Sequence, residues 1–449
     1  MDLAFKESFR VIFSINVFIN LACVKPKFVV QHRPFVSPSH VTFSVRLTIL
    51  LLSLVLILSI SLFTIAWVLS IDCSLKMASV ILPNQPVVID NGSGSIKAGF
   101  AGEDGPRVVF PNYVGVVKHS RVMAGGIVKD SLVGSDAQKY RGLLALRYPM
   151  EHGIVTDWNA MQQIWEFAYS PEQLNCNSAD HPVLLSEAPL NPLQNREKAM
   201  EIFFETFGVP SIHVQMQAVL SLYAAGRTTG VVLDSGDGVT HSVPVYEGFA
   251  IEPAIQRIDV AGRDVTNYLK LLLRKEGHIF HRSNEFELVR EMKESICQVL
   301  PYHSNITKED PVKSYTMADG QTIRVGNARF QAPEVLFRPE IIGLEYCGLA
   351  QCINNSISMS DTELRKELYN NILLSGGSTL FPGFGERVLH EVRKHIPADL
   401  KVRISAPQER IHSTWTGGSI LATLDTFRKI VRTKAQYENE GKNLARKAY

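Results

Sequence analysis

Short apolar runs that each end in a glycine-containing turn recur along the chain. Val87–Ile89 precedes Asp90-Asn91-Gly92-Ser93-Gly94, and Val231–Leu233 precedes Asp234-Ser235-Gly236-Asp237-Gly238. Each run is too short for a helix and is rich in β-branched residues, so the pattern predicts an interior strand that ends at a turn. A third run, Ile372–Leu374, opens into Ser375-Gly376-Gly377 in a similar way.

Amphipathic segments alternate with these strands, which is typical of α/β domains. Apolar residues at helical spacing, such as Met161, Trp165 and Ala168, predict helices that cover a sheet. Helices are expected over 157–169, 196–207, 217–225, 262–276, 284–299, 361–369 and 385–395, and further strands over 181–187 and 211–215. The polar stretch 301–326 is expected to consist of turns, and the polar tail 437–449 is too short for another domain.

The two aspartate-glycine turns carry candidate chemistry. Glycine lets backbone N–H groups approach an anion closely, and the Ser93 and Ser235 hydroxyls and the Lys97 ammonium add donors for phosphate oxygens. Asp90 and Asp234 facing one phosphate chain would repel each other unless a divalent cation lay between them, and hard oxygen ligands favour Mg²⁺ or Ca²⁺. One such turn alone is more often an ordinary hairpin. The pair, together with a Gly-Gly turn that admits a flat base, predicts an ATP site between two α/β lobes.

Composition is that of a globular protein. The 449 residues are 45% hydrophobic and 20% charged, enough for a large core and two domains. A net charge of +2 provides no broad basic field, so nucleic acid is not an expected partner. The six cysteines form no C-x-x-C pair and no zinc pattern, and we expect reduced thiols.

The first 76 residues differ in kind from the rest. The segment 47–71 contains no charged residue and is long enough to cross a bilayer. Lys and Arg upstream of it would hold the N-terminus in the cytosol and export everything after Ile71, including the Asn305-Ile306-Thr307 glycosylation acceptor. Export conflicts with an ATP site and with free thiols. We therefore hypothesise that residues 1–76 are not part of the working protein and that Met77 is its start.

Long motifs resemble those of the actin superfamily in actin's order, from Met77 to Tyr449. They are VVIDNGSGSIKAGFAGED, RYPMEHGIVTDW, QAVLSLYAAGRTTGVVLDSGDGVTH, NILLSGGSTLFPGF and STWTGGSILATL. RVMAGG, FFETFGVP, FRPEIIG and SAPQER are similar to the centractin group, the filament-forming actin-related proteins of dynactin. The resemblance implies an actin-like ATPase fold, in which two duplicated ribonuclease-H-like lobes surround a nucleotide cleft. The first lobe would comprise 77–224 plus 413–449, with 112–148 as its small subdomain, and the second 225–412, with 261–344 as its small subdomain.

The resemblance also implies roles for individual residues. Asp90, Gln217 and Asp234 would hold the metal, mostly through water. Gln217, His241 and Asp234 would form the catalytic set, with Gln217 and His241 orienting the attacking water. Nucleotide contacts would come from Asp90, Asn91, Gly92, Ser93, Gly94, Lys97, Ser235, Gly236, Asp237, Gly238, Arg290, Lys293, Glu294, Gly376, Gly377, Ser378 and Phe381. Without the family resemblance, Gln217 would be interpreted as the first residue of a helix and His241 as a packed strand residue. The charged residues of 290–294 would be interpreted as the solvent-exposed face of a helix.

Partners follow from the resemblance as well. It implies that the chain associates with itself into a filament and that its partners are dynactin subunits, barbed-end capping protein, spectrin-like cargo adaptors and dynein. The expected location is the cytoplasm and cytoskeleton. A membrane would be a partner only if the N-terminal extension is part of the protein. The loop 111–130 resembles the flexible loop that grips the next subunit. Ile411 and His412 stand where conventional actin has Lys and Tyr, which removes a polar nucleotide contact, and the segments 301–314 and 336–349 depart most from the centractin group.

Three classes of function remain open from the sequence. The first is a slow Mg-dependent ATPase coupled to filament assembly, either centractin-like or of the conventional actin type. The second is a small-molecule kinase with the same clamp, although no further Asp has the context of a base beside the γ-phosphate. The third, a chaperone-type ATPase, would need a peptide-binding domain after the clamp, for which the chain is too short.

Overall fold

The structure, a computed structural model, describes residues 84–118, 131–301, 312–317, 320–398 and 400–447. The extension 1–76 and its apolar segment 47–71 lie outside the described residues, as does the glycosylation acceptor at 305–307. No helix in the described ranges is long and apolar enough to cross a membrane.

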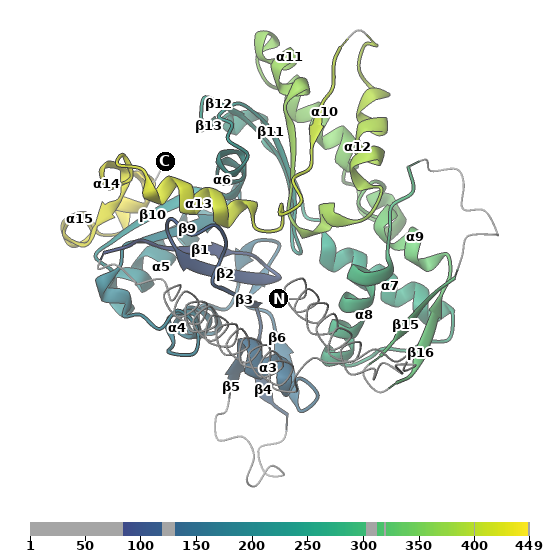
Figure 1. Ribbon diagram of the computed structural model, residues 1–449, viewed down its shortest axis with the longest axis horizontal. Helices are drawn as coiled ribbons and strands as arrows, with labels where there is room; N and C mark the ends of the chain where they lie inside the picture. Colours follow the sequence, from purple (N-terminus) through teal and green to yellow (C-terminus); the bar gives the residue numbers. More distant parts are fainter. Residues whose placement is uncertain (1–83, 119–130, 302–311, 318–319, 399, 448–449) are drawn as a thin grey trace, which may run out of the picture. The chain divides into compact units, whose positions relative to one another are not determined.

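Two mixed sheets, each flanked by helices, organise the part of the chain that the structure describes (Figure 1). The first has the order β19-β10-β9-β1-β2-β3, and the second has the order β13-β12-β11-β17-β18, with β14 paired to β12. The strands of the first are β1 (Val87–Asn91), β2 (Ser95–Phe100), β3 (Val108–Pro111), β9 (Val183–Glu187), β10 (Ser211–Met216) and β19 (Arg432–Thr433). Those of the second are β11 (Gly230–Ser235), β12 (Thr240–Tyr246), β13 (Phe249–Ala250), β14 (Gln256–Ile258), β17 (Ile372–Ser375) and β18 (Ile404–Ser405).

The two sheets repeat one plan. In each, a central strand, β1 or β11, pairs antiparallel with the next strand through a glycine turn. On its other side it pairs parallel with a later strand, β9 or β17, and then a further parallel strand follows. This repeated order confirms the expected α/β fold of two duplicated lobes.

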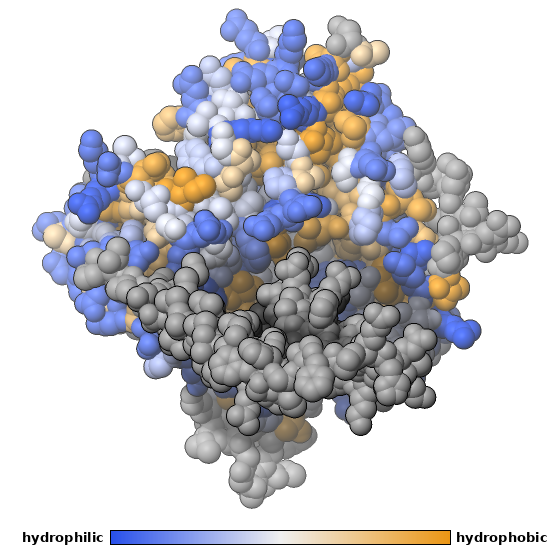
Figure 2. All heavy atoms as spheres, viewed as in Figure 1, coloured by the Kyte–Doolittle hydropathy of each residue, from blue (hydrophilic) through white to orange (hydrophobic). Residues whose placement is uncertain are grey.

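Helices cover both sheets. Around the first lie α4 (Trp158–Tyr169), α5 (Leu193–Glu201), α13 (Ser413–Thr423), α14 (Phe427–Ile430) and α15 (Lys434–Glu440), and α6 (Gln217–Ala224) lies between the two sheets. With the second are α7 (Gly262–Lys275), α8 (Ser283–Ile296), α9 (Ala328–Glu334), α10 (Leu349–Ser358), α11 (Thr362–Asn370) and α12 (Phe384–Arg393). The visible face in Figure 2 is mostly hydrophilic at its edge, with hydrophobic residues gathered where Figure 1 places α10 and α12.

Helices α6 and α13 cross at very close range between the sheets. A Cβ added to Gly417 would lie 1.7 Å from the carbonyl oxygen of Leu220, and one added to Gly418 would lie 2.8 Å from Val88 Cγ1. Only glycine permits this approach, which lets α13 pack against β1 and α6 at once. The crossing positions the start of α6, where Gln217 lies, beside the end of β1.

Small elements complete each half. The strands β4 (Val114–Val117), β5 (Ser131–Val133) and β6 (Leu144–Arg147) form a three-stranded sheet with α3 (Gly134–Lys139) beside it, and β7 (Met150–Glu151) pairs with β8 (Ile154–Val155). The beginning of the loop expected over 111–130 is therefore a strand, β4, which pairs antiparallel with β5 and β6. Gly115 lies so close to β6 that an added Cβ would meet Leu144 Cδ1 at 2.6 Å. Residues 119–130 lie outside the described residues.

Two local expectations are corrected. The stretch 301–326 was expected to consist of turns, but Lys313–Thr316 (β15) and Thr322–Val325 (β16) form an antiparallel hairpin, with Ile323 and Val325 buried. The helix expected over 284–299 ends at Ile296. The polar tail forms α15 and the 3₁₀ turn η6 (Gly441–Lys447), which buries Leu444 and Ala445.

Candidate functional site

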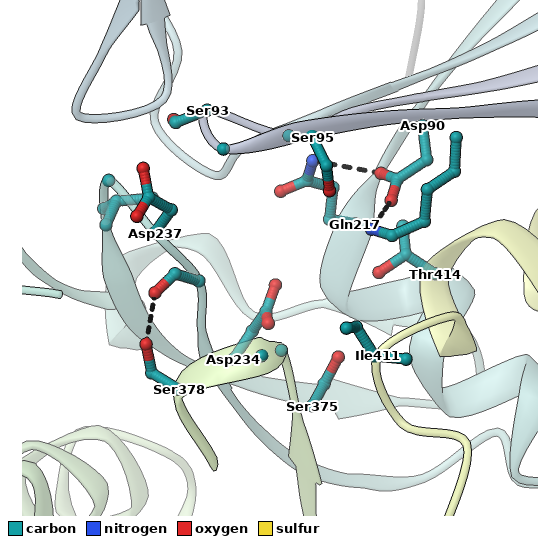
Figure 3. Close-up of a pocket in the computed structure, with 18 of the residues that line it drawn as sticks. Asp90, Ser93, Ser95, Gln217, Asp234, Asp237, Ser375, Ser378, Ile411 and Thr414 are labelled. Carbon is teal, nitrogen blue, oxygen red and sulfur yellow. Dashed lines mark hydrogen bonds and ion pairs between the residues drawn. The ribbon is translucent and has the colours of Figure 1, made fainter. Parts of the chain in front are cut away.

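A cavity of about 470 Å³ opens between the turns that follow β1, β11 and β17 (Figure 3). Its walls include Asp90 and Ser93 from the first sheet, Asp234 and Asp237 from the second, and Ser375 and Ser378 from the third turn. Because each turn directly follows a buried strand, the rigid sheets fix the backbone that faces the cavity.

The two aspartate-glycine turns approach each other closely, the glycine of each turn lying against a side chain of the other. A Cβ added to Gly94 would lie 2.7 Å from Asp237 Cβ, and one added to Gly238 would lie 2.6 Å from Ser93 Oγ. Neither position has room for a larger residue. The glycines therefore allow two loops from different sheets to present their N–H groups to one ligand, as phosphate-binding loops do.

Asp90 lies at the centre of a buried hydrogen-bond network at the end of β1. Its Oδ2 accepts from Lys97 Nζ at 2.8 Å, and its Oδ1 accepts from Ser186 Oγ at 2.6 Å and from Gln217 Nε2 at 3.3 Å (Figure 3 shows the bond from Gln217). Gln217 Nε2 also donates to the Asn91 carbonyl at 3.1 Å. The Asn91 side chain accepts from Trp165 Nε1 at 3.0 Å, so its oxygen is already engaged.

Asp234 differs from Asp90 in its partners. It is 7% exposed and points toward the cavity, and no Lys or Arg of the described ranges forms an ion pair with it. His241 Nε2 lies 3.4 Å from Asp234 Oδ2, yet neither ring nitrogen of this buried histidine has a hydrogen-bond partner within the described structure. A buried carboxylate and an unsatisfied imidazole thus face the same space, and both would gain from a polar or cationic ligand there.

The third turn lies against the second sheet. Gly376 has φ +87°, and a Cβ there would meet the Ser235 carbonyl oxygen at 2.3 Å, so only glycine fits. Ser378 Oγ donates to the Gly236 carbonyl at 2.6 Å, which ties this turn to the β11 turn (Figure 3). Ile411 lines the cavity beside it and is 40% exposed.

Charged residues of α8 line another part of the cavity. Arg290 bonds to both Glu287 and Glu294, and Lys293 Nζ donates to the Gly262 carbonyl at 2.9 Å. Burial alone would lower the pKa of Arg290, but the two glutamates outweigh it and raise that pKa. Burial lowers the pKa of Lys293, with Asp237 opposing the shift.

Arg263 of α7 connects the two sheets at the edge of the site. Its guanidinium bonds to Asp237 Oδ2 at 3.1 Å and to the carbonyls of Met150 and Ser93 at 3.2 and 3.3 Å, and it lies 4.6 Å from the Tyr148 ring centre. His152 Nδ1 is 2.9 Å from the Gly238 carbonyl oxygen on the same path. These contacts hold the β1 and β11 turns together.

The structure brings nearly all of the expected site residues to this cavity. Those that line it are Asp90, Asn91, Gly92, Ser93, Gly94, Lys97, Gln217, Asp234, Gly236, Asp237, Gly238, His241, Arg290, Lys293, Glu294, Gly376, Gly377, Ser378 and Phe381. Ser235 is not among them. Its side chain is fully buried and its Oγ is 2.9 Å from Thr240 Oγ1, so the expectation of a Ser235 hydroxyl facing a phosphate is not supported by its position.

Sequence reasoning missed two serines at equivalent positions in the two sheets. Ser186 ends the apolar run of β9 and bonds to Asp90, while Ser375 ends that of β17 and pairs in register with Asp234. The signal was present in the sequence, since both runs have the pattern of three apolar residues followed by serine. Ser375 further joins Ser221 and Ser413 in a buried hydroxyl cluster beneath the cavity.

The donor set fits a divalent cation bound together with phosphate oxygens. In the described part of the chain no three His, Cys, Asp or Glu side chains form a cage of their own. Asp234, Asp90 and Gln217 provide hard oxygen atoms on opposite walls, and the Asp234 carboxylate, which no Lys or Arg of the described ranges offsets, leaves negative charge for a cation to balance. A cation held here would take part of its shell from ligand and water oxygens.

Comparison with known proteins agrees with this geometry. A sequence profile described as actin matches residues 81–449. The chain belongs to the actin family. It is 56% identical to an "Actin-like protein" of Neurospora crassa over 358 aligned residues. The alignment covers 78% of this chain and 94% of the Neurospora protein. Actin-family proteins bind ATP or ADP with a divalent metal, and the matched range contains the whole cavity.

Proposed function

We propose that this actin-family chain is an ATP-binding filament subunit of the actin-related type, and that its filament is the centractin filament of dynactin, which supports dynein-driven transport along microtubules. One observation carries the proposal that the chain binds ATP. The β1 and β11 turns face each other so closely that Gly94 and Gly238 cannot be larger, with a buried carboxylate, Asp90 or Asp234, behind each turn. The RVMAGG, FFETFGVP, FRPEIIG and SAPQER segments support the centractin part.

The proposed roles follow the contacts. The backbone and serine of 91–94 and the glycines of 236–238 hold the phosphates, and the turn 376–378 with Phe381 and the α8 residues Arg290, Lys293 and Glu294 hold the adenosine. Asp90, Gln217 and Asp234 hold Mg²⁺, or Ca²⁺, mostly through water. The cation would neutralise phosphate charge. The two lobes proposed here are 77–224 with 413–449, and 225–412.

ATP hydrolysis would be slow and would be coupled to filament assembly. Gln217 Nε2 is occupied by Asp90 and Asn91, so its carbonyl oxygen is left to accept a hydrogen bond from a water. Both ring nitrogens of His241 lack partners within the described structure, so this side chain can orient the same water. Phosphoryl transfer asks for positioning and charge stabilisation, which these groups provide.

Proposed partners are other copies of the chain, dynactin subunits, barbed-end capping protein, spectrin-like cargo adaptors and dynein, in the cytoplasm and cytoskeleton. Sedimentation tests assembly, with the purified chain centrifuged in ATP and Mg²⁺ and again in EDTA. We expect a pellet only with ATP and Mg²⁺, and co-purification of dynactin subunits from cells. A protein that never sediments contradicts the filament role, and one that sediments without dynactin subunits contradicts the centractin role alone and favours a conventional actin.

A further inference from the structure

Two cysteines lie at the start of α10, away from the residues that line the cavity. Gly348 is the N-cap of this helix, so Cys347 precedes the cap and Cys352 is the fourth helical residue. Side chains at these two positions pack against each other at many helix starts. Here they are two thiols, joined side chain to side chain by a hydrogen bond.

The backbone around the pair is fixed. A Cβ added to Gly348 would lie 2.1 Å from the Phe337 carbonyl oxygen, Leu349 N–H donates to the Leu336 carbonyl at 3.3 Å, and Cys352 N–H donates to the Gly348 carbonyl at 2.9 Å. The contact between the thiols is therefore held by the fold on both sides.

The two thiols differ in access. Cys347 is half-buried, whereas Cys352 is fully buried beneath it and its Sγ lies 3.9 Å from the Gln256 carbonyl oxygen. The hydrogen bond from Cys352 lowers the pKa of the Cys347 thiol. Burial raises the pKa of Cys176 to about 11 and that of Cys297 to about 12, so these other thiols hold far less thiolate.

We propose that Cys347 and Cys352 are a thiol-oxidation site that forms a reversible disulfide within the chain. The Cys347 thiolate attacks a peroxide, whose O–O bond breaks to give a Cys347 sulfenic acid and an alcohol or water. The Cys352 sulfur then displaces the sulfenic oxygen as water, its proton leaving with it, and the S–S bond forms. Two thiols are oxidised, one peroxide is reduced, and a dithiol reverses the step.

The disulfide would act on an exposed segment. Between the 3₁₀ turn η4 (Pro339–Ile342) and α10, Glu345 is exposed and Tyr346 is 41% exposed, so this segment is available to a partner. An S–S bond ties its end to the first turn of α10. This inference concerns surface chemistry and is independent of nucleotide binding.

Peptide mapping of the folded full-length chain tests the site. The protein is treated with hydrogen peroxide, its free thiols are alkylated, and it is digested with trypsin and then with chymotrypsin, which cuts after Leu349. We expect two peptides joined by a Cys347–Cys352 bond, released by dithiothreitol, and loss of free thiol at Cys347 at least ~10-fold faster than at Cys176.

Single variants separate the steps. Cys352→Ser should leave a Cys347 sulfenic acid that dimedone traps, Cys347→Ser should keep Cys352 reduced, and Cys176→Ser should form the bond as before. Three results would each overturn the proposal: both thiols remain alkylatable after peroxide treatment, Cys176 oxidises as fast as Cys347, or the bond joins two chains on a non-reducing gel.

Discussion

Asp234 is the carboxylate on which the proposed metal site depends most, because no Lys or Arg in the described ranges offsets its charge. Asp234→Asn keeps the shape and removes the charge. We expect Mg-dependent retention of ATP to weaken by about 10- to 100-fold. The measurement is the dissociation rate of a fluorescent ATP analogue in Mg²⁺ and in EDTA.

Asp425→Asn is the matched control, since Asp425 is exposed and outside the cavity. It should leave the rate unchanged. An unaltered dissociation rate in Asp234→Asn would refute the role assigned to this residue.

His213 links stability to pH. Burial lowers its pKa to about 4 from an ordinary 6.5, so between these values the unfolded chain binds a proton that the folded chain does not. The stability that neutral His213 contributes is present above about pH 6.5 and is lost as pH falls toward 4, by up to about 3 kcal/mol. Urea unfolding of wild type and His213→Gln across this range should show a shallower pH slope in the variant.

A control variant removes an exposed imidazole, His281→Gln, and should keep the wild-type slope. If His213→Gln shows the same pH slope as wild type, burial of this side chain does not control acid stability.

Hydroxyl groups show where residue-scale prediction from the sequence succeeds and where it fails. The aspartate-glycine pattern located Asp90, Asp234 and their turns, because glycine and a strand-ending carboxylate leave a local signal. The direction of the Ser235 hydroxyl depends on Thr240 on the neighbouring strand, and the contact of Ser186 with Asp90 depends on parallel pairing of distant segments. Such pairings have no signature within one segment.

At the scale of elements, the crossing of α6 and α13 leaves no room for a side chain. Gly417→Ala would drive a methyl group into the Leu220 carbonyl, and we expect a loss of about 3 kcal/mol or more in the free energy of unfolding. Thermal unfolding with ligand absent measures it.

Gly385 of α12 offers a control glycine in a helix, where the nearest atom to an added Cβ is Leu374 Cδ1 at 3.7 Å. Gly385→Ala should stay within about 1 kcal/mol of wild type. Equal melting temperatures for the two variants would show that the crossing relaxes freely.

Element types followed from periodicity where the segment was long and amphipathic. The helix expected over 157–169 is present as α4, with the Asp157 carboxylate accepting from Ala160 N–H at its start. The segment expected as one helix over 196–207 begins earlier, at Leu193, and passes into a π-helical turn over Ile202–Thr206. The β15–β16 hairpin was missed because its strands are short and polar, and its two inward side chains are buried in a core that α7, α8 and α9 share.

At the scale of the whole molecule, Arg263 joins the two halves of the site through one side chain. Arg263→Ala removes its bonds to Asp237, Ser93 and Met150, so the turns should separate more often. We expect ATP to dissociate about tenfold faster. Stopped-flow exchange of a fluorescent ATP analogue measures this rate.

Arg274→Ala on the same helix is the control, because Arg274 is exposed. It should exchange at the wild-type rate. Identical rates in both variants would mean that Arg263 does not hold the cleft.

Duplication of the lobes was the large-scale feature best predicted from the sequence, since two copies of one strand-turn pattern imply two copies of one sheet. The sheets do share their strand order. How tightly the copies face each other became visible only in the structure, through Gly94 against Asp237 and Gly238 against Ser93.

The most direct measurement is of the nucleotide itself. The purified full-length chain is denatured, and the released small molecules are separated and identified, after prior dialysis in Mg²⁺ or in EDTA. We expect about one adenine nucleotide for each chain in Mg²⁺, and its loss in EDTA. A chain that carries no adenine nucleotide, and takes none up when Mg²⁺ and ATP are supplied, would contradict the account.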